Sequence, residues 1–400
     1  ERLKGDARRA WEEAAAAGIE PCAFAGAPPQ GEVLVDALLG TGLDRPLAGD
    51  WLAAVEAMNA SGRPVVAVDV PTGLHADGGR VLGAAVQATA TPTFIGRKFG
   101  LYTGAGPDHA GDVVFHDLGV PADIGAGMEP LAWLIDPVWA RAMLPLRSRT
   151  AHKGCFGHVL VIGGQPGMGG AAQLAGRAAL RSGAGLVSLA TAPEHAAMIS
   201  AVRPELMSHG VSGPGELEPL LERATVLALG PGLGQGAWGS ALFQAALASG
   251  LPLVVDADGL NLLAANPSRR EDWVLTPHPG EAARLLGCPV AEVQADRLAA
   301  AREIRRRYGG VVVLKGAGSL ILGERVFLSA TGNPGMASGG MGDVLTGVIA
   351  ALLAQGLAPG EAAAAGACLH GAAGDRAAGD GERGLLASDL IEALRGVVNG

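Results

Sequence analysis

Short runs of β-branched and other apolar residues alternate with alanine-rich segments of helical composition from one end of the chain to the other. This alternation is typical of parallel sheets whose strands are joined by crossover helices. The early strand candidates lie at residues 32–38, 64–70, 91–95 and 112–117, and each is flanked by proline, glycine or polar residues. We therefore expect an α/β fold.

The regular pattern weakens between residues 120 and 150, which separates the early strands from a second series. A length of 400 residues is enough for two domains that each bury a core. We therefore predict one domain over residues 1–134 and another over residues 135–400. The second strand series is expected at 158–162, 186–190, 225–229, 252–256, 273–276, 311–315 and 325–328.

Composition excludes several classes of partner. The formal net charge is −9, and an acidic chain without a basic stripe is a poor candidate for binding nucleic acid. The longest apolar run, residues 344–353, is too short to span a bilayer, so no membrane partner is expected. The four isolated cysteines, Cys22, Cys155, Cys288 and Cys368, fit neither a zinc site nor a disulfide framework. We therefore expect a reducing, cytoplasmic setting.

The strongest local feature is the glycine-rich segment 331–346, T-G-N-P-G-M-A-S-G-G-M-G-D-V-L-T, which leads into an apolar helix. Glycines directly before a helix leave backbone N–H groups free to converge on an anion, and the helix dipole favours negative charge there. Asp343, in the first helical turn, can accept a proton from a hydroxyl that reacts at phosphorus. The alternative is an ordinary N-cap. The density of glycines favours a functional site.

Three further turns follow predicted strands. They read L-G-P-G-L-G at 229–234, T-P-H-P-G-E at 276–281 and K-G-A-G-S at 315–319. Loops that follow strand C-termini line the ligand crevice of an open parallel sheet, so the three turns are expected to face one site. Each motif is weak by itself, and His278 alone would more often be structural. The occurrence of all three motifs in this order along one chain is what indicates a common site.

Six segments between about residues 150 and 395 resemble, in order, the motifs of the NAD(P)H-hydrate dehydratase family, which has the ribokinase-like fold. They read G-G-Q-P-G-M-G-G-A-A, L-G-P-G-L-G, V-D-A-D-G-L-N-L-L, L-T-P-H-P-G-E, K-G-A-G-S and N-P-G-M-A-S-G-G-M-G-D-V-L-T-G. The resemblance implies that the hydrated nicotinamide nucleotide contacts Ala171, Gly232 or its neighbour Gly234, His278 and Asp343. It implies that the adenine nucleotide contacts Lys315, Gly316, Ala317, Gly318, Ser319 and Gly342.

The same resemblance implies a reaction. ADP phosphorylates the hydroxyl group of the hydrate and becomes AMP. The phosphorylated hydrate then loses phosphate, which restores the dihydropyridine ring. The glycine turn would stabilise the transferred phosphoryl group while Asp343 takes the hydroxyl proton. Mg²⁺ is expected to bridge the nucleotide phosphates, although no dedicated metal cage is visible in the sequence.

The first domain carries two carboxylates at predicted strand ends. Asp36 follows E-V-L-V, and P-V-V-A-V-D-V-P-T-G places Asp69 and Thr72 after the next strand. Carboxylate, hydroxyl and carbonyl oxygens in this arrangement could hold a cation. Two capped turns are an equally good interpretation of the residues alone.

These segments resemble the NAD(P)H-hydrate epimerase family, whose domain is Rossmann-like. The resemblance implies K⁺ ligands at Asp36 and Thr72. It also implies substrate contacts at Gly40, Thr41, Gly42, Leu43, Asp44, Arg45, Pro46 and Asp69.

The first domain departs from that family in one respect. The family's upstream loop G-x-G-N-N-G-G-D-G has no counterpart in residues 1–31, which begin with a helical run at 8–17. We therefore expect an N-terminally incomplete epimerase domain whose truncated sheet exposes an edge, which favours association into a homo-oligomer.

Together the two resemblances imply a bifunctional repair enzyme that acts on hydrated NADH and NADPH. One alternative is a ribokinase-like kinase of a small vitamin-precursor alcohol, because fold alone does not separate these chemistries. Another is a non-enzymatic binding role for the first domain. The run N-P-G-M-A-S-G-G-M-G-D and the epimerase-like domain before it favour repair.

Overall fold

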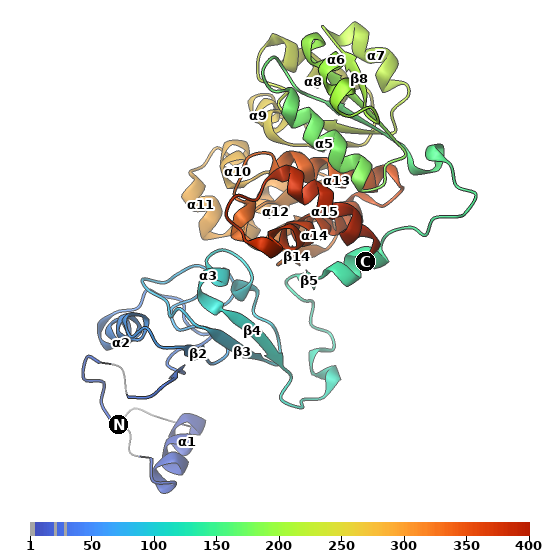
Figure 1. The fold of residues 1–400 in the computed structure, drawn as a ribbon. Helices are drawn as coiled ribbons and strands as arrows, with labels where there is room; N and C mark the ends of the chain where they lie inside the picture. The colour runs from blue at the N-terminus through green and yellow to red at the C-terminus, as the bar shows by residue number, and fades with distance from the viewer. Residues whose placement is uncertain (1–4, 20–21, 28–29) are drawn as a thin grey trace. The chain divides into compact units, whose positions relative to one another are not determined.

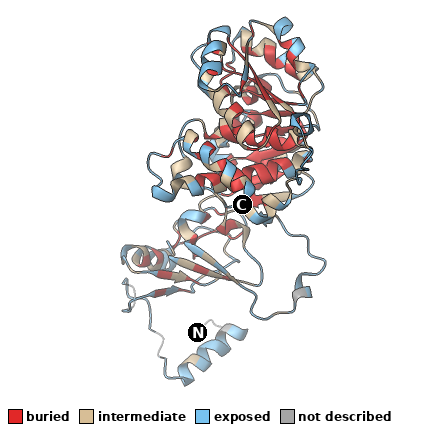
Figure 2. Ribbon diagram, turned by 45° about the vertical axis from the view of Figure 1, so that its right-hand side comes forward, coloured by how far each residue is buried: buried red, intermediate tan, exposed pale blue. Residues whose placement is uncertain are grey.

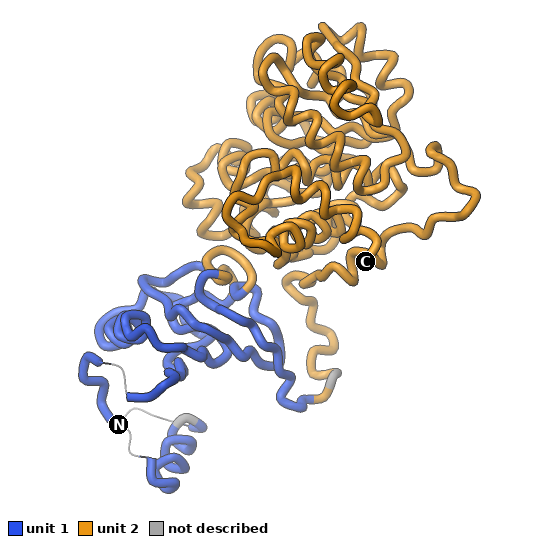
Figure 3. The backbone as a smooth tube through the Cα atoms, in the orientation of Figure 1, with its two compact units in different colours: residues 1–76, 80–101, 108–120 blue, residues 77–79, 102–107, 121–400 orange. Residues whose placement is uncertain are grey.

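The computed structural model describes residues 5–19, 22–27 and 30–400, and it contains two compact units (Figure 1). Unit 1 comprises residues 1–76, 80–101 and 108–120, and unit 2 comprises residues 77–79, 102–107 and 121–400 (Figure 3). The helical run expected at the N-terminus forms α1 (Gly5–Ala16). The α/β class expected from the alternating pattern is confirmed in both units.

Unit 1 is built on a four-stranded parallel sheet in the order β1-β2-β3-β4. The strands are β1 (Leu34–Asp36), β2 (Val65–Ala67), β3 (Ala90–Phe94) and β4 (Asp112–His116), which confirms all four expected strands. Helix α2 (Gly49–Ala60) buries Val55 and Met58 in the core of this unit. A short helix, α3 (Gly106–Ala110), precedes β4.

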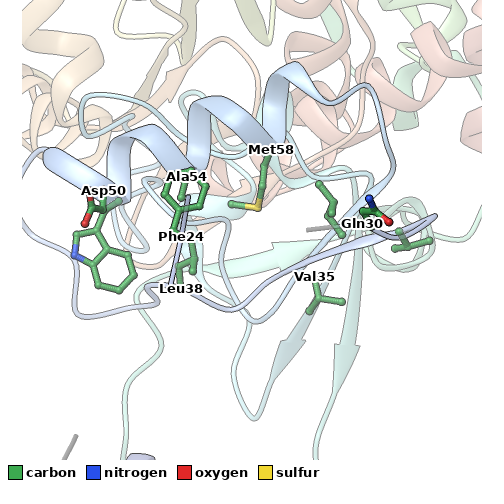
Figure 4. Close-up of a pocket in the computed structure, with 10 residues that line it drawn as sticks. Phe24, Gln30, Val35, Leu38, Asp50, Ala54 and Met58 are labelled. Atoms are coloured by element: carbon green, nitrogen blue, oxygen red, sulfur yellow. The ribbon is translucent and has the colours of Figure 1, made fainter. Parts of the chain in front are cut away.

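Strand β1 lies at the edge of this sheet, and among the described residues only β2 pairs with it. The side chains of Val33 and Val35 are 51% and 64% exposed. A pocket of about 460 Å³ opens between β1 and α2, and Figure 4 shows Val35 and Leu38 on one side of it and Met58 on the other. The exposed edge expected from the sequence is therefore confirmed.

Unit 2 is built on a ten-stranded sheet in the order β5-β14-β13-β12-β11-β10-β9-β6-β7-β8. The run from β12 to β8 is parallel, while β13 pairs antiparallel with both β12 and β14. The strands are β5 (Trp133–Ile135), β6 (His158–Ile162), β7 (Leu186–Thr191), β8 (Met207–Gly210), β9 (Val226–Leu229), β10 (Leu253–Val255), β11 (Trp273–Leu275), β12 (Val311–Leu314), β13 (Ser319–Leu322) and β14 (Val326–Ser329). The seven expected strands are present, and β5, β8 and β13 are additional.

Helices pack against this sheet, and Figure 2 shows that buried residues are concentrated in the sheet and in the helices that cover it. In α13, 11 of the 14 residues are buried. Helix α13 crosses α5 so closely that a side chain on Gly347 would collide with the carbonyl oxygen of Ala175. None of the described helices is long and apolar enough to cross a membrane. The helices of unit 2 are α4 (Pro137–Ala142), α5 (Gly169–Arg181), α6 (Pro193–Val202), α7 (Pro214–Leu221), α8 (Ala237–Ala248), α9 (Ala257–Ala265), α10 (Pro279–Leu286), α11 (Val290–Ala295), α12 (Arg297–Tyr308), α13 (Met341–Ala354), α14 (Pro359–Ala377) and α15 (Ala387–Asn399).

Candidate active sites

In unit 2 the glycine-rich turns follow parallel strands that lie side by side, so they meet at one edge of the sheet. The turn after β6 contacts the turn after β9, because the N–H of Gln165 donates to the carbonyl oxygen of Gly232 over 2.7 Å. The turns after β11 and β12 are joined in the same way, from the N–H of Lys315 to the carbonyl oxygen of Pro277 over 2.9 Å. The four turns therefore lie along one rim as two joined pairs, with the turn after β10 between them.

The N-terminus of α13 lies at this rim and has no side-chain cap. Its N-cap residue Gly340 has φ +90°, a left-handed conformation that favours glycine. A Cβ atom on Gly342 would lie 3.2 Å from Lys315 Nζ and 3.3 Å from Asp256 Oδ2, so the helix starts directly beside these charges. The N–H groups of the first turn have no acceptor within the helix, and they fit a phosphate or another anion.

A buried charge cluster lies beside this helix terminus. Lys315 Nζ is 2.6 Å from Asp256 Oδ1 and 3.5 Å from Glu281 Oε2. Asp256 Oδ2 also accepts a hydrogen bond of 2.9 Å from the hydroxyl of Thr346 on α13. Burial raises the pKa of Asp256, but the charge and hydrogen bond of Lys315 outweigh it, so this pKa lies below its usual value. The lysine is therefore the counter-ion of two buried carboxylates.

Asp343 faces the same cluster from the first turn of α13. Burial, followed by the negative charge of Asp256, raises the pKa of Asp343 to about 7, and the positive charge of Lys315 only partly opposes this rise. The carboxylates of Glu281 and Asp258 add to the rise. A base whose pKa lies near neutral pH can take up a proton and release it again under physiological conditions.

The comparisons with known proteins agree with this geometry. Residues 159–395 match the NAD(P)H-hydrate dehydratase family, and residues 1–100 match the family described as YjeF-related protein N-terminus. The bifunctional NAD(P)H-hydrate repair enzyme of Coxiella burnetii is 48% identical over 100% of this chain and 82% of its own length. The enzyme of the same name from Escherichia coli is 46% identical over 93% of this chain and 72% of its own length. This chain belongs to the bifunctional NAD(P)H-hydrate repair enzymes.

Solved structures place unit 2 in the ribokinase-like fold, as expected. A ribokinase-like protein from Enterococcus faecalis has a TM-score of 0.62 and is 30% identical, covering 68% of this chain and 96% of its own. The ADP/ATP-dependent NAD(P)H-hydrate dehydratase from Bacillus subtilis, co-crystallised with ATP and Mg²⁺, has a TM-score of 0.59 and 31% identity. That match covers 66% of this chain and 97% of the other.

The repair-enzyme motifs implied four substrate contacts in unit 2, and the structure brings two of them, Ala171 and Gly232, together. A Cβ atom on Gly232 would lie 3.2 Å from the Cβ atom of Ala171, and one on Gly234 would collide with the side chain of Gln165. His278 is the N-cap of α10, and its Nδ1 accepts from the N–H of Gly280 over 2.9 Å. Its ring is half exposed, and burial lowers its pKa, so it is neutral near pH 7.

The implied nucleotide loop, residues 315–319, turns from β12 into β13. Gly316 and Ala317 are exposed, whereas Gly318 is buried. Arg297, which is 3% exposed, donates to the carbonyl oxygens of Leu314, Lys315 and Gly318 over 3.2 to 3.4 Å. Burial lowers the pKa of Arg297 to about 10. The buried guanidinium of Arg297 therefore fixes the backbone of this loop, and the sequence motifs did not identify this residue.

Other residues of the site were also missed. Asp256 and Glu281, the partners of Lys315, lie inside the motifs V-D-A-D-G and T-P-H-P-G-E. Because both motifs follow predicted strands, their position in the sequence could have identified these two carboxylates as site residues. Asp375 on α14 accepts from the N–H of Gly332 at 2.9 Å and from Asn333 Nδ2 at 3.0 Å, which orients the N-P-G turn. No local pattern marks Asp375, because it lies more than 40 residues from its partners.

His370 supports the same helix terminus from α14. Its Nε2 donates to the carbonyl oxygen of Met341 over 2.9 Å. Burial lowers the pKa of His370 to about 4, so the ring is neutral and keeps its proton on the nitrogen that faces the carbonyl. This bond fixes the first residue of α13.

In unit 1 the residues implied as K⁺ ligands lie together. Thr72 Oγ1 is 2.7 Å from Asp36 Oδ1 and 3.0 Å from the carbonyl oxygen of Leu39, and the N–H of Thr72 donates to Asp36 Oδ2 over 2.7 Å. Both side chains are buried. A carboxylate, a hydroxyl and a carbonyl oxygen therefore lie next to one another here. Oxygen atoms of these types can coordinate K⁺, so the residues fit a bound K⁺ ion.

The substrate loop implied in unit 1, residues 40–46, is mostly exposed and is anchored by buried Leu47, whose N–H donates to the carbonyl oxygen of Leu82. Asp69 lies after β2, at the edge of the sheet where Asp36 ends β1. The strands of this sheet are parallel, so these implied contacts share its C-terminal edge.

Proposed function

We propose that unit 2 dehydrates the S epimer of NADH hydrate and NADPH hydrate at the expense of ADP, giving AMP and phosphate. We propose that unit 1 interconverts the R and S epimers. The observation that carries the first activity is Asp343, a base with a pKa of about 7 at an uncapped helix N-terminus.

The chain's own residues account for the steps of the dehydration. Asp343 accepts the proton of the substrate hydroxyl as its oxygen attacks the terminal phosphorus of ADP. The N–H groups of Met341 and Gly342 stabilise the charge on the transferred phosphoryl group. Phosphate then leaves the ring carbon while the neighbouring ring carbon loses a proton to water, which restores the double bond of the dihydropyridine. His278, Ala171 and Gly232 would hold the nicotinamide nucleotide.

The adenine nucleotide would lie along residues 315–319 and contact their backbone, because the Lys315 side chain is held by Asp256 and Glu281. Mg²⁺ would neutralise the phosphates of ADP. Among the described residues no cluster of three or more ligating side chains is present, so the phosphate oxygens would supply most of its ligands. K⁺ would be held by Asp36 and Thr72 in unit 1, where it would supply fixed positive charge.

Absorbance at 340 nm tests both activities in one experiment. The complete chain is added with ADP and Mg²⁺ to a mixture of both epimers, and a parallel sample receives ATP. Recovery of about half the signal indicates a dehydratase that uses one epimer, and prompt full recovery indicates that unit 1 also works. No recovery with either nucleotide contradicts the proposal.

Two further properties are proposed. The exposed β1 edge supports self-association into a homo-oligomer, which light scattering coupled to gel filtration measures. Cys155, Cys288 and Cys368 carry free thiols, which agrees with a reducing cytoplasm. Localisation of a tagged chain by fractionation tests the second point.

A further inference from the structure

Two charged side chains meet at the C-terminal edge of the unit 1 sheet. Asp69 lies two residues beyond β2, and Lys98 lies four residues beyond β3, the neighbouring strand. Lys98 Nζ is 2.5 Å from Asp69 Oδ1 and donates a second hydrogen bond of 2.7 Å to the carbonyl oxygen of Phe94. Ligands bind at this edge of open parallel sheets.

The conformation around Asp69 indicates more than an incidental ion pair. Its φ angle is +71°, a left-handed conformation that is strained for a residue with a side chain. The N–H of Phe94 and the hydroxyl of Thr93 also donate to Oδ1, over 3.0 and 3.1 Å. The described hydrogen bonds of this carboxylate therefore all use one oxygen, and Oδ2 remains for a ligand.

The pair is sheltered but still accessible. The side chain of Asp69 is 26% exposed and that of Lys98 is 18% exposed. Partial burial raises the pKa of Asp69, but the hydrogen bond and charge of Lys98 and the N–H of Phe94 outweigh it and hold the pKa below its usual value. A carboxylate base and an ammonium acid therefore lie side by side.

We propose that Lys98 is a catalytic residue of the epimerisation and acts as the proton donor beside the base Asp69. This inference rests on the function proposed for unit 1. In the hydrate the hydroxyl oxygen and the ring nitrogen are bonded to the same carbon, so the base and the acid must lie close together. The contact between Asp69 and Lys98 meets this requirement.

The step balances without a further reactant. Asp69 takes the hydroxyl proton, the oxygen forms a carbonyl with the carbon, and the bond from that carbon to the ring nitrogen breaks. The electron pair of that bond remains on the nitrogen, which receives a proton from Lys98. Rotation about the adjacent carbon–carbon bond presents the other face of the aldehyde. Closure reverses each transfer, so the nitrogen returns its proton to Lys98 and the oxygen regains one from Asp69.

The test follows purified R epimer by chromatography, in the complete chain and without ADP, so that unit 2 consumes no product. We compare the wild type with Lys98→Met, Lys98→Arg and Arg97→Met. Lys98→Arg keeps the positive charge beside Asp69 but does not release its proton. Arg97 is the matched control, because its guanidinium stacks 4.5 Å above the ring of Phe115.

We expect kcat to fall at least about 100-fold in both Lys98 variants, because general acid catalysis contributes roughly 10²–10⁴-fold. KM should change less than about threefold, and Arg97→Met should epimerise like the wild type. A further variant, Lys98→Ala, is assayed with added ethylammonium, which should restore part of its lost rate.

Two outcomes overturn the inference, and they are distinguishable. An active wild type together with near-normal turnover by Lys98→Arg shows that the ion pair is only structural, and the function of unit 1 stands. A wild-type chain that converts no R epimer refutes that function and the inference with it.

Discussion

Replacing Lys315 by methionine should destabilise unit 2, because the lysine is the counter-ion of two buried carboxylates. Asp256 is 1% exposed and Glu281 is 5% exposed. Removing one partner of a buried ion pair leaves an uncompensated charge and costs roughly 3–5 kcal/mol. For a domain of this size the loss corresponds to a fall of roughly 10 °C in the midpoint of thermal unfolding.

The same substitution should move the pH dependence of the dehydratase. The positive charge of Lys315 opposes the rise in the pKa of Asp343, so its removal should raise that pKa above about 7. Because Asp343 must be ionised to accept a proton, the rising limb of the kcat/KM profile should shift to higher pH.

Calorimetry and a pH series of initial rates measure these two effects. The matched control is Arg306→Met, which removes an exposed ion pair with Glu303 and should change neither quantity measurably. A Lys315→Met/Asp256→Asn double variant should recover part of the lost stability, because one of the two carboxylates is then neutral. An unchanged unfolding midpoint in Lys315→Met would refute the assignment of Lys315 as a buried counter-ion.

Three further substitutions test the site and the packing around it. Asp343→Asn should abolish turnover but leave ADP binding measurable by calorimetry. The substitution should also stabilise unit 2 at pH 8 by at most roughly 4 kcal/mol. The pKa of Asp343 is raised to about 7 in the folded protein, so the folded protein loses stability as pH rises to that value and the carboxyl ionises, and asparagine does not ionise. Asp375→Ala should lower kcat/KM about tenfold, because the hydrogen bonds that the N-P-G turn donates to this carboxylate are worth roughly 1.5–3 kcal/mol. An unchanged kcat/KM would show that the turn needs no anchor. Gly347→Val should lower the unfolding midpoint by several degrees through collision with Ala175, whereas Gly360→Ala, where the space is open, should not.

Much of the fold could be predicted from the sequence because strand positions depend on local composition. Apolar runs bounded by glycine and proline marked all four strands of unit 1 and seven strands of unit 2. The strands that were missed have a different origin. Trp133–Ile135 becomes β5 only because it pairs with β14, almost 200 residues away, and the M-S-H-G segment of β8 is polar and lies at the sheet edge.

By itself the sequence determined the α/β class, the glycine turns and the position of Asp343 in the first turn of an apolar helix, since each depends on residues within a few positions of one another. Only the tertiary structure decided what the charged side chains contact. Lys315 meets Asp256 across 59 residues, and Lys98 meets Asp69 across 29. The proton affinity of Asp343 is the sum of burial and charges contributed by separate strands and helices. Such electrostatic effects act through space, so no local pattern in the chain contains them.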